Sequence, residues 1–188
     1  MKDDIIEWQI ENFNSLCDKA KFLIFKNIME CEPNDINFFT VYEINDDETK
    51  LTPIEQILCI AFKLYELYSK QRTPRPSFVD IQHPIKCNEN NYIVDFFIDT
   101  IILPTEEYEV FLNKPIAIEC DGFDYHSNKK QMNNDYKREN DLKLAGYNVI
   151  RFTGSQIYNT PFECVEVVYK ELENVFKNKE YNSGEDNE

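Results

Sequence analysis

The sequence predicts an α/β domain built on a mixed sheet of about four or five strands flanked by helices. Three observations support this prediction. Three strand-like apolar segments follow one another, a fourth comes after a polar helix, and amphipathic helices precede and follow the series. Because the third and fourth strands flank a helix, they should be parallel neighbours joined by a right-handed crossover. The first three strands can form a meander.

The first fifty residues predict a helical arm of unknown role. Apolar residues recur at spacings of three and four through residues 3–31, which is typical of an amphipathic helix. Residues 36–44 predict a short strand, and the polar stretch 44–53 predicts a linker.

A second helix should begin after this linker and end near Tyr68. Thr52 can cap it, with Pro53 at the first helical position and Glu55 three residues after the cap. This is a capping-box pattern, in which the Glu55 carboxylate binds the backbone N–H of Thr52.

The central segment then predicts three consecutive strands, a helix, a fourth strand and a closing helix, followed by an acidic tail. Gly146 fits the end of the first helix of this series. The polar tail, residues 177–188, predicts disorder, so the expected domain covers residues 51–176. The strands are expected at 77–85, 92–102, 115–121 and 147–154, and the helices at 128–145 and 160–177.

The net charge of −15 argues against an open nucleic-acid-binding surface, since phosphate contacts need Lys and Arg. The charge is uneven, however. Residues 1–56 hold five Lys and thirteen acidic residues, and residues 163–188 hold three Lys and eight acidic residues. The acidic ends can keep the chain soluble, repel nucleic acid, or contact a protein partner through the N-terminal arm.

The cysteines and the hydropathy pattern favour a cytoplasmic protein that does not enter membranes. None of the six cysteines falls in a CxxC pair, so the sequence favours buried reduced thiols over a zinc site. No apolar run reaches the roughly 20 residues that span a bilayer. The acidic start MKDDIIEW does not resemble a signal peptide.

Carboxylates interrupt two of the predicted core strands. Glu119 and Asp121 end the third strand and should share one face, because side chains alternate along a strand. Asp95 lies in the second strand and can stand beside Glu119 if the two strands pair. Aspartates at strand ends also cap turns, and Asp121-Gly122 is a turn signal in its own right.

Three clustered carboxylates repel one another, and partial burial would force one of them to take up a proton. A divalent cation removes this repulsion, and oxygen ligands of this kind suit Mg²⁺ or Mn²⁺. Such an ion can activate water and stabilise the charge of a reacting phosphodiester.

Five short motifs, taken in their order along the chain, resemble the PD-(D/E)XK nuclease superfamily. The closest resemblance is to its small endonuclease domains related to very-short-patch-repair endonucleases. The resemblance covers roughly residues 51–176 and includes the helix that carries Glu55. The residues that match the family pattern are Gln82, Asp95, Glu119-Cys120-Asp121-Gly122, His126, Asp135 with Arg138, and Gly146 through Phe152.

The resemblance implies a restriction-endonuclease-like sheet with Mg²⁺, replaceable by Mn²⁺, at the strand ends, and hydrolysis of phosphodiester bonds in DNA. Asp95 and Glu119 would bind the ion, the carbonyl of Cys120 would be a third ligand, and Gln82 would join the site. Glu55 would hold a second ion or a metal-bound water.

Asp121 stands where the superfamily pattern has Lys, which leaves the general base unassigned. A metal-bound water, His126, or a lysine from 129–137 can take this role. His126 lies in a polar loop, where it is either catalytic or an ordinary surface histidine.

The remaining basic residues have two interpretations each. Asp135 and Arg138 are three residues apart on a helix, so they either form a salt bridge or place Arg138 on a phosphate. The other candidates for DNA contact are Arg72, Arg75, Lys129, Lys130 and Arg151.

The leading hypothesis is a metal-dependent DNA endonuclease acting in phage defence, in a mobile element or in DNA repair. A second hypothesis is an inactive or partner-dependent nuclease-fold subunit that binds nucleic acid or protein. A third is a metal-dependent enzyme acting on RNA or a nucleotide. The oligomeric state is not predicted.

Overall fold

The computed structural model describes residues 13–14, 16–30, 51–68, 74–87, 89–103, 109–122, 129–178 and 180–182. The chain divides into two compact units, one of residues 1–70 with 156–165 and one of residues 71–155 with 166–188. The expected strand at 36–44, most of the N-terminal arm, Arg72 and His126 lie outside the described residues.

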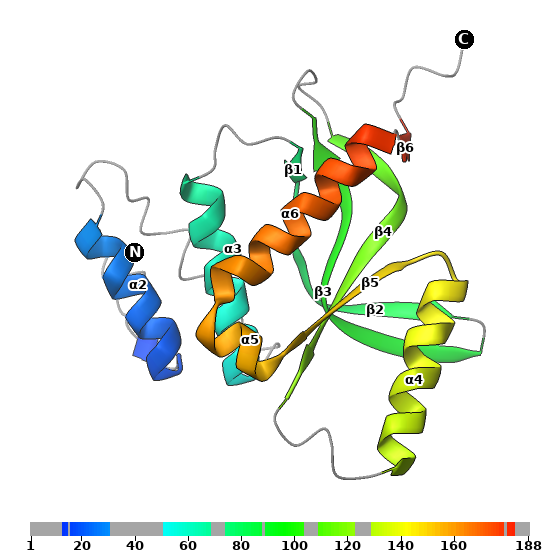
Figure 1. Ribbon diagram of the computed structural model, residues 1–188, viewed down its shortest axis with the longest axis horizontal. Coiled ribbons are helices and arrows are strands. Elements are labelled where there is room, and N and C mark those ends of the chain that lie inside the picture. The colour runs from blue at the N-terminus through cyan, green and yellow to red at the C-terminus, as the bar shows by residue number, and fades with distance from the viewer. Residues whose placement is uncertain are drawn as a thin grey trace, which may run out of the picture. The chain divides into compact units, whose positions relative to one another are not determined.

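The first unit contains α2 (Asp18–Glu30) and α3 (Pro53–Tyr68), which pack together (Figure 1). The prediction of one continuous helix over 3–31 is wrong, because Leu16 and Cys17 are not helical. The Cys17 N–H instead donates to Gln56 Oε1 of α3 at 2.8 Å. A tertiary contact thus replaces a helical hydrogen bond at this position.

The Glu55 half of the predicted capping box of α3 is present. The backbone N–H of Thr52 donates to Glu55 Oε2 at 2.7 Å, and Pro53 begins the helix. The inward face of α3 is strongly apolar, and Ile57, Leu58 and Ile60 are almost completely buried. Burial of these side chains stabilises α3 more than its helix propensity does.

The second unit is a curled mixed sheet with flanking helices, as the sequence predicts (Figure 1). β2, β3 and β4 form the antiparallel meander, and β5 pairs with β4 in parallel. β1 pairs with the end of β3. The strands are β1 (Arg75–Pro76), β2 (Asp80–Cys87), β3 (Asn90–Ile102), β4 (Glu109–Asp121), β5 (Asn148–Thr153) and β6 (Tyr181–Asn182).

Helix α4 (Lys129–Leu144) is the crossover between β4 and β5. Its Leu142 is fully buried in a cluster with side chains of the sheet: Ile85, Cys87, Val94, Phe97 and Ala117. The helix ends at the predicted place, where Gly146 has φ 96°, a conformation that glycine adopts without steric cost.

Two helices follow β5. The short α5 (Gly154–Asn159) occupies residues where the sequence predicted the end of a strand and a loop. The closing helix, α6 (Pro161–Asn178), agrees with the expected helix at 160–177. Asn148 Nδ2 of β5 donates to Glu171 Oε1 of α6 at 2.7 Å, which ties these two elements together.

Two strand boundaries differ from the prediction. β4 begins at Glu109 rather than at 115, because Val110 and Leu112 alternate with exposed residues and extend the buried face. The tail is also ordered further than expected. Lys177 and Asn178 belong to α6, and β6 pairs Tyr181 with Leu112 of β4, so the prediction of disorder from 177 is wrong for these residues.

The described cysteines are free thiols, and Cys59, Cys87 and Cys164 are buried as predicted. Cys17 and Cys120 are only partly buried, and Cys31 lies outside the described residues. Burial raises the pKa of Cys59 and of Cys164 to about 11, which keeps both thiols protonated near neutral pH. In the part of the chain that the structure describes, no helix has the combination of length and apolarity needed to cross a bilayer.

Candidate functional site

The carboxylates meet where β3 and β4 separate. The two strands pair as far as Phe96 and Ile118, and β4 then continues beside β5 through Cys120 and Asp121. β3 meanwhile continues with β2 as a hairpin. Separation of two strands leaves backbone groups without their ladder partners, and side chains can bind them. The site is built at this point.

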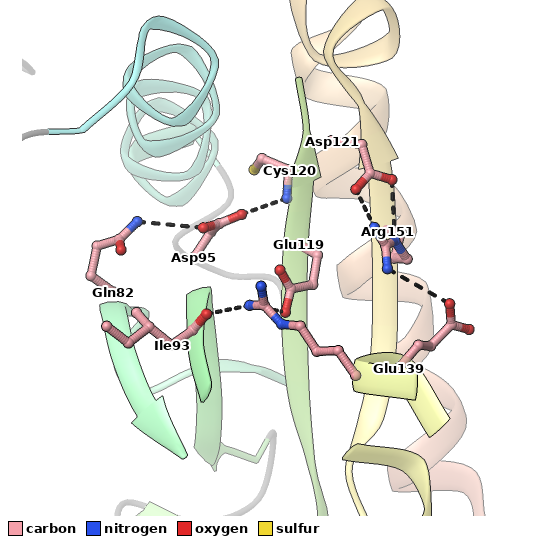
Figure 2. Close-up of polar contacts among 9 residues, drawn as sticks. Gln82, Ile93, Asp95, Glu119, Cys120, Asp121, Glu139 and Arg151 are labelled. Atoms are coloured by element: carbon pink, nitrogen blue, oxygen red, sulfur yellow. Dashed lines mark hydrogen bonds and ion pairs between the residues drawn. The ribbon is translucent and has the colours of Figure 1, made fainter. Parts of the chain in front are cut away.

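Asp95 occupies the position at which the strands part. Its Oδ2 accepts the backbone N–H of Cys120 at 2.6 Å, a group that the β3–β4 ladder would otherwise use. Its Oδ1 accepts from Gln82 Nε2 at 3.4 Å. Figure 2 shows Asp95 between Gln82 and Cys120. Both carboxylate oxygens are therefore oriented by neutral N–H donors.

Gln82 interrupts β2 at the level of Asp95. It has φ 52°, a conformation uncommon for a residue other than glycine. The pairing of β2 with β3 skips it, since Ile81 pairs with Phe96 and His83 with Val94. This strained backbone directs the Gln82 amide to Asp95, which supports a positioning role for Gln82.

Glu119 is the most deeply placed carboxylate of the site, and only 6% of its surface is exposed. Arg138 of α4 donates from Nη2 to Glu119 Oε1 at 2.6 Å. The same nitrogen donates to the carbonyl oxygen of Ile93, and the guanidinium lies 5.9 Å from the centre of the Tyr92 ring. The sequence offered a pairing of Arg138 with Asp135, but Arg138 pairs with Glu119 instead.

The pKa of Glu119 is raised to about 7, chiefly because burial disfavours the charged form. The Arg138 guanidinium lowers this pKa, and the Asp95 carboxylate raises it. Within the described residues, Asp95 is bound by neutral donors, and Arg138 is the guanidinium that forms an ion pair with Glu119. Arg151 also lowers the pKa of Glu119, but it is paired with Asp121. Charge compensation at this pair is therefore incomplete.

Asp121 belongs to a second ion pair, on the side of β4 that neighbours β5 (Figure 2). Arg151 of β5 donates from Nε to Asp121 Oδ2 at 3.1 Å and from Nη2 to Oδ1. Arg151 Nη1 also lies 3.8 Å from Glu139 Oε2 of α4. Two of the three expected carboxylates thus pair with arginines, Glu119 with Arg138 and Asp121 with Arg151, whereas Asp95 is bound by neutral donors.

The other candidate residues lie outside this cluster or outside the described side chains. Arg75 belongs to β1, at the far end of β3 from Asp95. Lys129 and Lys130 begin α4, but the structure does not describe their side chains. Glu55 belongs to the first unit, where it caps α3.

Sequence reasoning missed a polar contact that anchors α4 to the β2–β3 hairpin. Tyr92 Oη donates to Asp141 Oδ2 at 2.6 Å, and Asn90 Nδ2 donates to the same oxygen at 3.2 Å. The bond to Asp141 raises the pKa of Tyr92 to about 12. The spacing of Asp141 three residues after Arg138 was a signal, since both then lie on one helix face.

Comparison with known families agrees with this geometry. Residues 81–172, from β2 into α6, match the family model REase_MTES_1575, a restriction-endonuclease-like family. The match supports a nuclease-fold domain. No curated protein and no solved structure gives a significant match to the chain. The nuclease-fold domain includes both ion pairs, whereas Glu55 and Arg75 precede the matched segment.

The chemistry of the donor groups around Asp95 fits a hard divalent cation. The carboxylates of Asp95 and Glu119 come from adjacent strands, and oxygen ligands of this type suit Mg²⁺. No cluster of three His, Cys, Asp or Glu side chains suited to a metal occurs among the residues with described side chains. A backbone carbonyl, water or substrate oxygen would have to complete the coordination.

Proposed function

We propose that the nuclease-fold domain is a Mg²⁺-dependent DNA endonuclease of the PD-(D/E)XK type, similar to very-short-patch-repair endonucleases. The observation that carries this proposal is the meeting of Asp95 and buried Glu119 at the point where β3 and β4 part. The restriction-endonuclease-like family match supports phosphodiester hydrolysis as the reaction class.

In this proposal, Asp95, Glu119 and the Cys120 carbonyl hold the ion, and Mn²⁺ can replace Mg²⁺. When bound, the ion supplies an activated water and compensates the charge of the reacting phosphodiester. The amide of Gln82 and the N–H of Cys120 hold the Asp95 carboxylate in one orientation. Glu55 is proposed to contribute to a second ion or a bound water.

The proton-transfer groups come from the segment after β4. His126 can protonate the leaving oxygen, since an ordinary histidine titrates near neutral pH. Asp121, held by Arg151, is proposed to act beside the ion-binding pair. Arg72, Arg75, Lys129 and Lys130 are proposed to contact DNA phosphates.

The test is a cleavage assay on supercoiled plasmid, single-stranded DNA and RNA, with Mg²⁺, Mn²⁺ or EDTA. We expect the full chain to nick and linearise the plasmid with either ion and to be inactive in EDTA. Asp95→Ala and Glu119→Ala should each lower cutting at least about a hundredfold, since each removes a group central to charge stabilisation.

Asp99→Asn is the matched control for these variants. Asp99 lies on β3 four residues beyond Asp95, about 13 Å along the strand, so its neutralisation should leave cutting unchanged. Full cutting by either alanine variant would refute the proposed site. Cutting of RNA but not DNA would redirect the proposal to a ribonuclease.

The two arginine–carboxylate pairs favour one alternative, a nuclease-fold subunit that binds nucleic acid or protein without cutting. In such a subunit Arg138 and Arg151 would neutralise the carboxylates permanently. Calorimetry with Mn²⁺ separates the two functions. The endonuclease binds the ion through Asp95 and Glu119, and the binding module shows no heat that depends on these residues.

A further inference from the structure

Arg138 compensates the charge of Glu119 without using its full hydrogen-bonding capacity. Nη2 makes both described hydrogen bonds, one to Glu119 Oε1 and one to the carbonyl oxygen of Ile93. Nε is buried and has no hydrogen-bond partner within the described part of the chain. A guanidinium has five N–H donors, so this one retains donors that a second anion can use.

The surroundings of Arg138 hold its guanidinium between the protein and solvent. Its side chain is 26% exposed, whereas that of Glu119 is 8% exposed. The Tyr92 ring lies 5.9 Å from the guanidinium carbon, and an aromatic face attracts a cation without fixing its direction. The guanidinium can therefore turn outward while Glu119 stays in place.

From this geometry we infer that Arg138 exchanges partners: it neutralises Glu119 in the ion-free chain and transfers to a DNA phosphate when a divalent cation binds Glu119. The inference rests on the proposed function. The divalent ion and the Arg138 guanidinium are both positively charged and repel each other when both lie next to Glu119. They therefore compete for its carboxylate. A guanidinium released beside the ion can bind a phosphate through two parallel N–H···O bonds.

Partner exchange and an ordinary structural salt bridge predict opposite changes in ion affinity when Arg138 is removed. If Arg138 competes with the ion, its removal raises ion affinity, because the ion no longer displaces a bound guanidinium. If Arg138 only holds Glu119 in a productive orientation, its removal lowers ion affinity. DNA affinity gives an independent readout, since the exchange makes the Arg138–phosphate contact depend on the ion.

The experiment compares wild type, Arg138→Met and Arg138→Lys by calorimetry with Mg²⁺ alone, at the alkaline plateau of a pH titration where Glu119 is ionised. We expect Arg138→Met to bind Mg²⁺ roughly tenfold more tightly than wild type, which corresponds to about 1.4 kcal/mol. Arg151→Met is the matched control. Arg151 pairs with Asp121 and lowers the pKa of Glu119 less than Arg138 does, so the change in Mg²⁺ affinity should be smaller.

Duplex DNA binding is then measured by anisotropy in Ca²⁺, used as a non-cleaving ion, and in EDTA. In wild type, Ca²⁺ should raise DNA affinity. Arg138→Met should lose most of that increase while binding DNA as wild type does in EDTA. Arg138→Lys keeps the charge but not the planar pair of donors, so it should keep near-wild-type Mg²⁺ affinity and only part of the Ca²⁺-dependent increase.

The outcomes separate this inference from the proposed function. Thermal melting first establishes whether each variant is folded. If Arg138→Met is unfolded, the test uses Arg138→Lys alone. Equal or weaker Mg²⁺ binding by Arg138→Met, or the full Ca²⁺-dependent increase in Arg138→Lys, overturns the exchange even if wild type cuts DNA. A wild-type chain that neither binds Mg²⁺ nor cuts overturns both claims.

Discussion

Glu119 shows how a single buried carboxylate links stability to function. It is only 6% exposed, it lies beside Asp95, and it forms an ion pair with Arg138. A carboxylate in these surroundings is stable when it is protonated, paired with a cation or bound to an ion. The residue therefore costs folding free energy in the ion-free chain, and this cost favours ion binding.

The pH dependence of stability follows from the raised pKa of Glu119, about 7 against 4.5 for an ordinary glutamate. The folded state binds this proton more tightly than the unfolded state does. The stabilisation is therefore present below about pH 4.5 and is lost as the pH rises to about 7. Relative to Glu119→Gln, wild type should lose on the order of 3 kcal/mol of unfolding free energy across this window.

Urea denaturation of both proteins in EDTA, over a series of pH values, measures this difference. Glu119→Gln cannot titrate at this position and serves as the baseline for all other groups. A difference that stays constant from about pH 4.5 to 7 would show that Glu119 keeps an ordinary pKa.

At the scale of elements, alternation and helical periodicity predicted most of the sheet because those signals are local. Ile116, Ile118 and Val94 follow the expected pattern and are fully buried. The start of β4 was missed although Val110 and Leu112 alternate, since the predicted strand began only at Pro115. Pro115 instead lies where the β3–β4 register shifts, a place that does not need its missing N–H.

Long-range contacts explain the remaining errors. The break before α2 depends on Gln56, which is 39 residues from Cys17. The partner of Arg138 depends on how α4 docks on the sheet, because Glu119 is 19 residues away. The sequence correctly placed Asp95 beside β4, but it could not predict that arginines would pair with Glu119 and Asp121.

Helix α3 provides a prediction that separates the two roles of Glu55. Glu55→Ala removes the acceptor for the Thr52 N–H and should lower the unfolding free energy by about 1 kcal/mol. Glu55→Gln retains an acceptor and should keep nearly wild-type stability. If Glu55 also serves a second ion, Glu55→Gln should lower plasmid cutting at least about tenfold.

Chemical denaturation and the plasmid assay on the same two variants measure both effects. Unchanged cutting by Glu55→Gln would restrict Glu55 to its capping role. Equal stability of the alanine variant and wild type would contradict the contribution of the cap.

At the scale of the whole molecule, the net charge of −15 limits how DNA can bind. A chain of this charge repels DNA at long range, so attraction must come from local basic groups and bound cations. Two of the six proposed contact residues, Arg138 and Arg151, already pair with carboxylates in the ion-free chain. The remaining four are Arg72, Arg75, Lys129 and Lys130.

The affinity for DNA in EDTA should therefore depend less on salt concentration than it would if all six residues contacted phosphates. Four phosphate contacts predict a slope of log K against log salt concentration no steeper than about −4. Anisotropy with a short duplex across a monovalent salt series measures this slope. A value of about −6 or steeper would mean that the chain presents a larger basic surface than the proposed one.

The central claim is that Asp95 and Glu119 jointly hold the divalent cation used in phosphodiester hydrolysis. Diffraction from a crystal soaked in Mn²⁺ tests it most directly. We predict an anomalous peak bonded to a carboxylate oxygen of each residue, with the Arg138 guanidinium moved away from Glu119. Arg138 still bound to Glu119, with no peak between the two carboxylates, would contradict the claim.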